Sequence, residues 1–128
     1  MLQNKSAPGT FLAPVSYTLS GTSIPQSIVV ADVNGDGRPD IVIGGTTVVN
    51  VLLNSASTPG TFLAAASYAT TNASQVAIAD VNGDGLVDIV VPVGVSHPLV
   101  NGIYTNNPGV FLQVAGAPGT FAAEVDLP

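Results

Sequence analysis

Two short stretches of the chain gather carboxylates at a spacing that suits a hard metal ion. Six of the eight acidic residues fall in them, and each stretch has side-chain oxygens at its first, third, fifth and ninth positions. These residues are Asp32, Asn34, Asp36 and Asp40 in the first stretch and Asp80, Asn82, Asp84 and Asp88 in the second. Calcium takes about six to eight oxygen ligands, from carboxylates, amides, backbone carbonyls and water. We therefore expect two calcium ions per chain, with the backbone carbonyls of Arg38 and Leu86 at the seventh positions as further ligands.

Without a cation, the carboxylates of each stretch would repel one another. At separations of a few ångströms each pair costs about 1–4 kcal/mol, depending on the local dielectric. Lys5 and Arg38 are the only basic residues of the chain, so its own side chains provide little neutralisation. Asn-Gly and Asp-Gly pairs also favour simple polar turns, but a turn does not require four oxygen-bearing side chains at odd positions in both stretches.

An EF-hand loop is the alternative that shares most of this pattern. It also requires a glutamate at the twelfth position and a helix that follows. The twelfth positions here are Ile43 and Val91, which lie in apolar runs typical of β-strands. The sequence therefore favours a calcium loop between two strands.

The remaining side chains offer little for catalysis. His97 is the only histidine and there is no cysteine, which argues against a transition-metal site, a zinc cluster and thiol chemistry. No Gly-x-Ser-x-Gly element accompanies Ser96, and the carboxylate pair Glu124 and Asp126 lies on one predicted strand near the end of the chain. We expect no enzymatic activity and no metal-binding role for His97.

Composition narrows the class of protein further. The 128 residues carry a net charge of -6, with only 8% charged and 46% hydrophobic residues. Two basic residues cannot form a nucleic-acid surface, no run of 18 apolar residues could span a membrane, and the first residues lack a signal-peptide pattern. A soluble monomer usually has roughly 25–35% charged residues on its surface, so we expect much of this surface to be covered by other units or copies.

The two acidic stretches belong to an internal repeat. The segment from Asp32 to Val42 recurs 48 residues later, and a Pro-Gly-Thr-Phe element ends at Phe11, Phe62 and Phe121. The spacings of this element, 51 and 59 residues, place an insertion within 92–109 of the second unit. We expect a single repeat array over 1–128, made of an outer hairpin of a preceding blade (1–23), a first full blade (24–71) and a second full blade (72–128).

Each unit is predicted to form four short strands rich in Val and Ile and bounded by Gly, Pro, Asn and Ser. No stretch has a sustained helical period. The first strands are expected at 27–31 and 75–79, the second at 40–43 and 88–91, the third at 48–53 and 110–114, and the fourth at 11–17, 62–68 and 121–127. The expected fold is all-β, with tandem four-stranded antiparallel blades of the β-propeller type, about two and a half in number.

The order of these elements resembles a known family. Phe-x-x-x-x-Ser-Tyr is followed by Val-Ala-Ile-Ala-Asp-Val-Asn-Gly-Asp-Gly-x-x-Asp-Ile-Val and then by Val-x-Val-Leu-Leu-Asn, and nearly the whole chain is similar to FG-GAP/VCBS repeats. That family includes integrin α-subunit-like propellers and many secreted bacterial proteins. The resemblance implies structural calcium ions in the acidic loops and an extracellular or cell-surface location. Propellers have about four to eight blades, so the chain is expected to be part of a larger or oligomeric array.

The resemblance also implies a class of function. We expect a non-catalytic module for extracellular binding, cell adhesion or scaffolding, in which calcium stabilises the loops between strands. Two alternatives stay open: a self-assembling filament or surface-lattice subunit, and a lectin-like accessory module of a secreted hydrolase. The insertion 92–109, with His97, Asn101 and Tyr104, is the candidate recognition loop for a protein or carbohydrate ligand.

Overall fold

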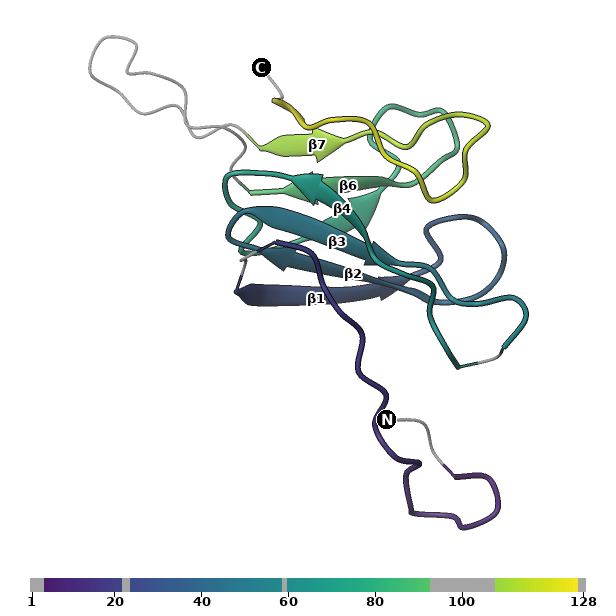
Figure 1. Ribbon diagram of the computed structural model, residues 1–128. Helices are drawn as coiled ribbons and strands as arrows, with labels where there is room; N and C mark the ends of the chain where they lie inside the picture. Colours follow the sequence, from purple (N-terminus) through teal and green to yellow (C-terminus); the bar gives the residue numbers. More distant parts are fainter. Residues whose placement is uncertain (1–3, 22–23, 59, 93–107, 127–128) are drawn as a thin grey trace, which may run out of the picture.

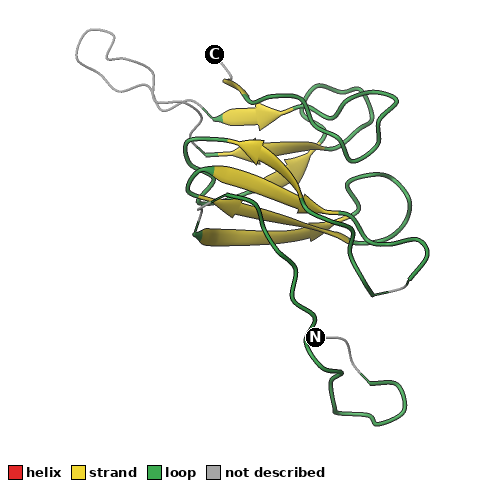
Figure 2. Cartoon of the chain, in the orientation of Figure 1, coloured by secondary structure: helices red, strands yellow, loops and turns green. Residues whose placement is uncertain are grey.

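The computed structural model describes residues 4–21, 24–58, 60–92 and 108–126, which form two four-stranded antiparallel sheets (Figure 1). In each sheet the spatial order of the strands follows the order of the chain. The first sheet contains β1 (Pro25–Ala31), β2 (Asp40–Gly45), β3 (Val48–Leu52) and β4 (Ala66–Ala69). The second contains β5 (Ala77–Ala79), β6 (Asp88–Val91), β7 (Gly109–Phe111) and β8 (Val125–Asp126). The described residues form strands and loops and no helix, so the predicted all-β class is confirmed (Figure 2).

The predicted fourth strands were too long. The strand expected at 62–68 forms only as β4, and of the one expected at 121–127 the described residues 121–126 form only β8. Asn54 pairs with Phe62 and Val51 pairs with Ala66, so the outer strand has one residue more than its partner between these pairs. An extra residue of this kind is a β-bulge, which interrupts the ladder and bends the strand. The pairs Gln113–Phe121 and Val110–Val125 show the same shift in the second sheet.

The strand predicted at 11–17 is wrong. Only Phe11 makes an isolated bridge, and residues 12–17 belong to no strand. Residues 4–10 form a turn in which Asn4 N donates to Thr10 O at 2.9 Å. The described residues provide no third strand beside this segment, and Pro14 has no N–H to donate, so a ladder cannot continue here.

The core lies between the two sheets. Val42 and Val51 of the first sheet and Ile89 and Phe111 of the second are at most 1% exposed and belong to one cluster. Gly44 on β2 permits close approach of the sheets, because a Cβ at this position would lie 2.6 Å from a methyl group of Val76. Apolar burial of this kind is the main favourable contribution to folding.

The sheets stack front to back. Val42 and Val90 occupy equivalent repeat positions, yet Val42 is buried while Val90 is only half-buried. Ile41 and Ile89 show the reverse, since Ile89 is buried and Ile41 is half-buried. Side chains alternate between the two faces of a strand, so Val42 and Ile41 lie on opposite faces. We call the face that carries Val42, or Val90 in the second sheet, the front, and the face that carries Ile41 or Ile89 the back. The front of the first sheet therefore covers the back of the second. Consecutive repeats therefore use opposite faces for the same contact.

Tyrosines connect consecutive units in a repeated way. The Tyr17 hydroxyl accepts a hydrogen bond from Phe62 N at 3.1 Å, and the two rings meet edge to face at 5.6 Å. Tyr68 has the same relation to Phe121, with a hydrogen bond of 3.2 Å and a ring distance of 5.6 Å. Each pair joins the tyrosine that ends one Phe-to-Tyr segment, at 11–17 or 62–68, to the phenylalanine that follows the next Pro-Gly-Thr. This contact is part of the repeat, although the sequence pattern alone gave these tyrosines no role.

We predict that Tyr68→Phe lowers the free energy of unfolding by about 0.5–1.5 kcal/mol, because it leaves the Phe121 N–H without its acceptor while keeping the ring. Urea unfolding followed by circular dichroism measures the change. Tyr68→Leu, which also removes the ring contacts, should cost more. Equal stability of Tyr68→Phe and the parent chain would show that the hydroxyl contributes nothing.

Candidate metal-binding loops

The two acidic loops extend from the same end of the sheets, on the right of Figure 1. Each connects the first two strands of its sheet, β1 to β2 and β5 to β6. Positive φ angles between 74° and 85° at four glycines allow the tight wrap: Gly35, Gly37, Gly83 and Gly85. Residues with a Cβ rarely adopt this conformation, so the glycines of the Asn-Gly-Asp-Gly element determine the shape of the loop.

The first aspartate of each loop binds backbone N–H groups. Asp32 Oδ1 accepts from Gly35 N at 2.8 Å, and its Oδ2 accepts from Gly37 N at 2.8 Å. Asp80 accepts from Gly83 N and Gly85 N at 2.7 and 2.9 Å. The N–H groups of Gly85 and Gly83 hold the pKa of Asp80 below its ordinary value of 3.8, because they favour the charged form. The loop conformation therefore stabilises a carboxylate at its first position.

The third and fifth positions are linked by side-chain hydrogen bonds in both loops. The amide nitrogen of Asn34 donates to Asp36 Oδ2 at 2.8 Å, and the amide nitrogen of Asn82 donates to Asp84 Oδ2 at 2.9 Å. The backbone N–H at the seventh position donates to the fifth-position carboxylate, from Arg38 at 2.9 Å and from Leu86 at 2.8 Å. The two loops thus share one hydrogen-bond pattern.

The loops differ at the seventh position. In the first loop the Arg38 guanidinium forms an ion pair with Asp36 at 2.6 Å, whereas Leu86 cannot do so in the second. Desolvation raises the pKa of Asp36, but hydrogen bonds from Asn34 and Arg38 and the positive charge of Arg38 outweigh it, so the pKa lies below 3.8. The first loop is partly neutralised by its own side chain.

The ninth-position aspartates are buried and structural. Asp40 has 0% exposure, and its two oxygens accept from Val33 N at 2.9 Å and Asn54 N at 2.7 Å. Asp88 is buried to the same degree and accepts from Val81 N at 3.1 Å and Gln113 N at 2.9 Å. Each carboxylate ties the start of its acidic loop to the end of the third strand. The sequence analysis predicted both residues as calcium ligands. In the structure, their carboxylates accept hydrogen bonds from backbone N–H groups.

Gln113 connects the two loops, a role that sequence reasoning missed. Its side-chain amide donates to Val33 O of the first loop at 2.7 Å and to Val87 O of the second at 2.8 Å. Asn54, at the equivalent position, donates only to Pro39 O within its own unit, at 2.9 Å. A polar residue at the end of an apolar third strand was the signal that could have identified it. A small hollow of about 110 Å³ separates the loops beside Gln113.

The first loop brings together some, but not all, of the oxygen donors that the sequence predicted. Asp32, Asn34 and Asp36 lie within hydrogen-bonding distance of the same short backbone segment, while Asp40 lies beneath it in the protein interior. In the part of the chain that the structure describes, no three carboxylate or histidine side chains converge closely enough to enclose a metal ion. The donor set is entirely oxygen, which suits calcium in kind. Carboxylate oxygens retain further lone pairs beyond those used here.

The predictions for His97 and for the insertion concern residues outside the described ranges. His97, with Ser96, Asn101 and Tyr104, lies in 93–107, outside the described residues, as does most of the insertion 92–109.

The described residues contain no helix that could cross a membrane.

Comparison with known proteins identifies a repeat family. A family model described as FG-GAP-like repeat matches residues 1–43 and 32–91. No curated protein and no solved structure matches the chain. The matched residues include the first sheet, both acidic loops and the start of the second sheet. Repeats of this family are typical of extracellular, adhesion-type modules.

We predict that Asp40→Asn destabilises the protein by about 1–3 kcal/mol, because an amide NH₂ would face one of the two buried backbone N–H donors. Unfolding in urea with excess chelator isolates this effect from any bound metal. Asp36→Asn, at an exposed position of the same loop, is the matched control and should change stability little. If both variants unfold at the same urea concentration as the parent chain, the structural role of Asp40 is wrong.

Proposed function

Since this chain belongs to the FG-GAP-like repeat family, we propose that it is a non-catalytic, calcium-binding repeat module for extracellular binding, adhesion or scaffolding. The observation that carries this proposal is the repetition of one loop structure in two stacked sheets, with the same hydrogen bonds at equivalent residues. Structure that repeats in this way serves to build an extended surface from similar units. The extracellular or cell-surface setting is where calcium is abundant enough to fill loops of modest affinity.

The sheets are proposed to be blades of a propeller-type array. The first sheet lies within the predicted blade 24–71 and the second within 72–128. The hydrogen bond between Tyr17 and Phe62 N supports the proposal that the segment 4–21 belongs to the outer part of a preceding blade. Front-to-back stacking supports this arrangement, because every further unit could add in the same orientation. The partners of the chain are then other blades of the same type, in a larger or oligomeric array.

Calcium is proposed to bind each loop through its oxygen donors. In the first loop these are the side chains of Asp32, Asn34 and Asp36, the carbonyl of Arg38, and Asp40; the second uses Asp80, Asn82, Asp84, the carbonyl of Leu86, and Asp88. The ion would supply positive charge that relieves repulsion between the carboxylates and stiffens the turn between two strands. The all-oxygen donor set and the conformation shared by both loops support two ions per chain.

One alternative has a specific observation in its favour. A self-assembling filament or surface lattice requires open surfaces, and Ile28 and Val30 on β1 are 65% and 62% exposed. The lectin-like alternative depends on the insertion 92–109, most of which lies outside the described residues. We therefore favour the repeat module, and ligand recognition by protein or carbohydrate stays a prediction.

The metal proposal predicts two calcium ions per chain in titration calorimetry, with affinities of about 0.1–1 mM. Asp36→Ala and Asp84→Ala should each remove one ion and lower the melting temperature in calcium, because each deletes a central donor of one loop. His97→Ala is the control and should leave the titration unchanged. A melting temperature that neither variant changes, with or without calcium, would rule out a structural ion.

Arg38→Leu tests the same proposal in the opposite direction, since it gives the first loop the seventh residue of the second. Loss of the ion pair with Asp36 should raise the calcium affinity of the first loop by about two- to fivefold at low ionic strength. The gain should shrink in high salt, where exposed charges are screened. Weaker binding by Arg38→Leu at low salt would contradict the assignment of Asp36 as a ligand.

A further inference from the structure

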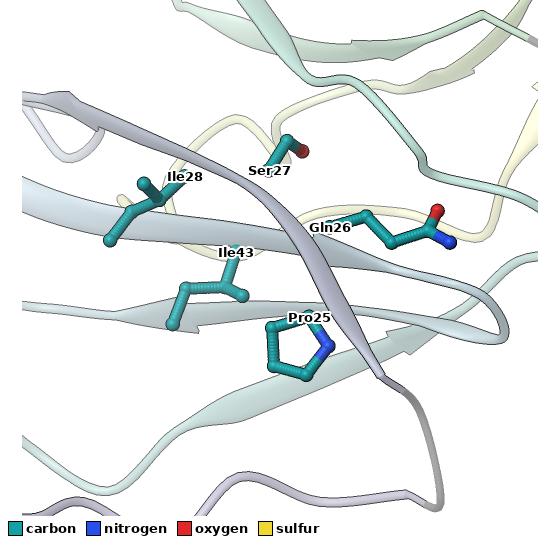
Figure 3. A pocket seen from close by; sticks show the side chains of 5 residues that line it. All are labelled: Pro25, Gln26, Ser27, Ile28 and Ile43. Carbon is teal, nitrogen blue, oxygen red and sulfur yellow. The ribbon is translucent and has the colours of Figure 1, made fainter.

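An apolar surface lies open on the back of the first sheet. Ile28 and Val30 of β1 project from it, and their cross-strand partners on β2 are Ile43 and Ile41. These four residues are called the back patch below. A groove of about 330 Å³ runs beside it, lined by Pro25, Gln26, Ser27, Ile28 and Ile43 (Figure 3). Exposure of large aliphatic side chains in a cluster usually marks an interaction surface.

The second sheet shows what covers this surface. Val76 and Ile78 occupy the positions equivalent to Ile28 and Val30, 48 residues later. Both are half-buried and pack against the core cluster that includes Val42. The occupant of the back of the second sheet is therefore the front of β1 and β2, the inner hairpin of the preceding unit.

The outer half of each back face is covered by a different element. In the second sheet, Tyr68 from the preceding unit packs against Phe111 with a ring distance of 6.0 Å and binds Phe121 N. In the first sheet, Tyr17 binds Phe62 N, and Ser20 N donates to Asn50 Oδ1 at 3.3 Å. Tyr17 and Ser20 therefore contact the outer half of the first unit as Tyr68 of the preceding unit contacts the second.

The back faces of the two sheets differ only at the inner strands, which are covered in the second sheet and exposed in the first. On β3, Asn50 and Leu52 share the back face and are 3% and 2% exposed, while Ile28 on β1 is 65% exposed. Among the described residues, nothing packs over the back patch as β1 and β2 pack over Val76 and Ile78. The surface has the shape and polarity of an interface that the protein already contains once.

We propose that the back patch is the docking site for the inner β-hairpin of another FG-GAP-like repeat unit, two short apolar strands joined by an acidic loop. The occupant places its residues equivalent to Val29 and Val42, a cross-strand pair on the front of the inner hairpin, on the patch, as Val42 packs in the core between the two sheets. Its tyrosine-bearing segment is already represented by residues 4–21. The inference rests on the blade stacking proposed above and does not depend on calcium.

A chain extended by the inner hairpin and third strand of one further unit tests this directly. A copy of residues 24–52 is inserted immediately before Leu2. Leu2 is equivalent to Leu53 in the repeat, so the copy continues into residues 2–21 as Leu52 continues into Leu53 in the parent chain. The chain contains no cysteine, so Ile28→Cys at the original position reports exposure of the patch by its rate of reaction with a thiol reagent. We expect this rate to fall at least about tenfold in the extended chain, because reaction then requires the packed face to open.

The controls locate the effect. Val81→Cys, 45% exposed in the second acidic loop, should react equally fast in both chains. An extension with Asn at the copies of Val29 and Val42 should give no protection. Val30→Cys replaces Ile28→Cys if the latter does not fold.

The proposal would be overturned if Ile28→Cys reacted at the same rate in the extended and the unextended chain, or if the Asn-bearing extension protected it equally well. It would also be overturned if Ile28→Cys were already protected in the unextended chain by dimer formation, because a second copy would then be the occupant. Each rate is measured in calcium and in chelator. Absent protection with normal calcium binding rejects the docking site alone, and intact protection without calcium binding rejects the proposed function alone.

Discussion

The buried carboxylates of Asp40 and Asp88 are the constraint on which the arrangement of each repeat depends. Each lies in the interior with no exposed surface and accepts one N–H from its own acidic loop and one from a residue just after the third strand. A buried carboxylate is costly unless its oxygens are satisfied, so the loop and the strand must reach it together. This requirement sets the position of the loop relative to the sheet. The glycines then allow the remaining donors to wrap above the buried aspartate.

Coupling between repeats follows from a second set of contacts. Gln113 reaches carbonyls of both acidic loops, and Tyr17 and Tyr68 each bind the backbone of the following unit. These contacts lie toward the loop end and the outer strands, whereas the valines and Ile89 fill the space between the sheets. Neighbouring units are therefore held by polar contacts around an apolar interface. Such nearest-neighbour coupling is what allows a repeat array to be stable although each unit alone buries little.

Much of the fold followed from patterns that depend on local chemistry. The acidic loops, the inner strands and the all-β class were predictable because Asn-Gly-Asp-Gly and runs of Val and Ile determine local conformation. The fourth strands were not, since the bulge before Ala66 depends on register with β3, and 11–17 had the right residues but no described neighbouring strand. The burial of Asp40 could not be deduced either. An aspartate in a metal-type pattern and an aspartate that ties two backbone segments have the same sequence signature.

Amide hydrogen exchange tests the central role of the buried aspartates most directly. The N–H groups of Val33 and Asn54 bind Asp40, and those of Val81 and Gln113 bind Asp88. The account predicts that these four amides exchange slowly in chelator, at rates similar to those of the inner strands, and that calcium adds protection mainly at the loop glycines. Fast exchange of the four amides in chelator, with the strands still protected, would contradict it, because the loops would then be anchored by the ion and not by the carboxylates.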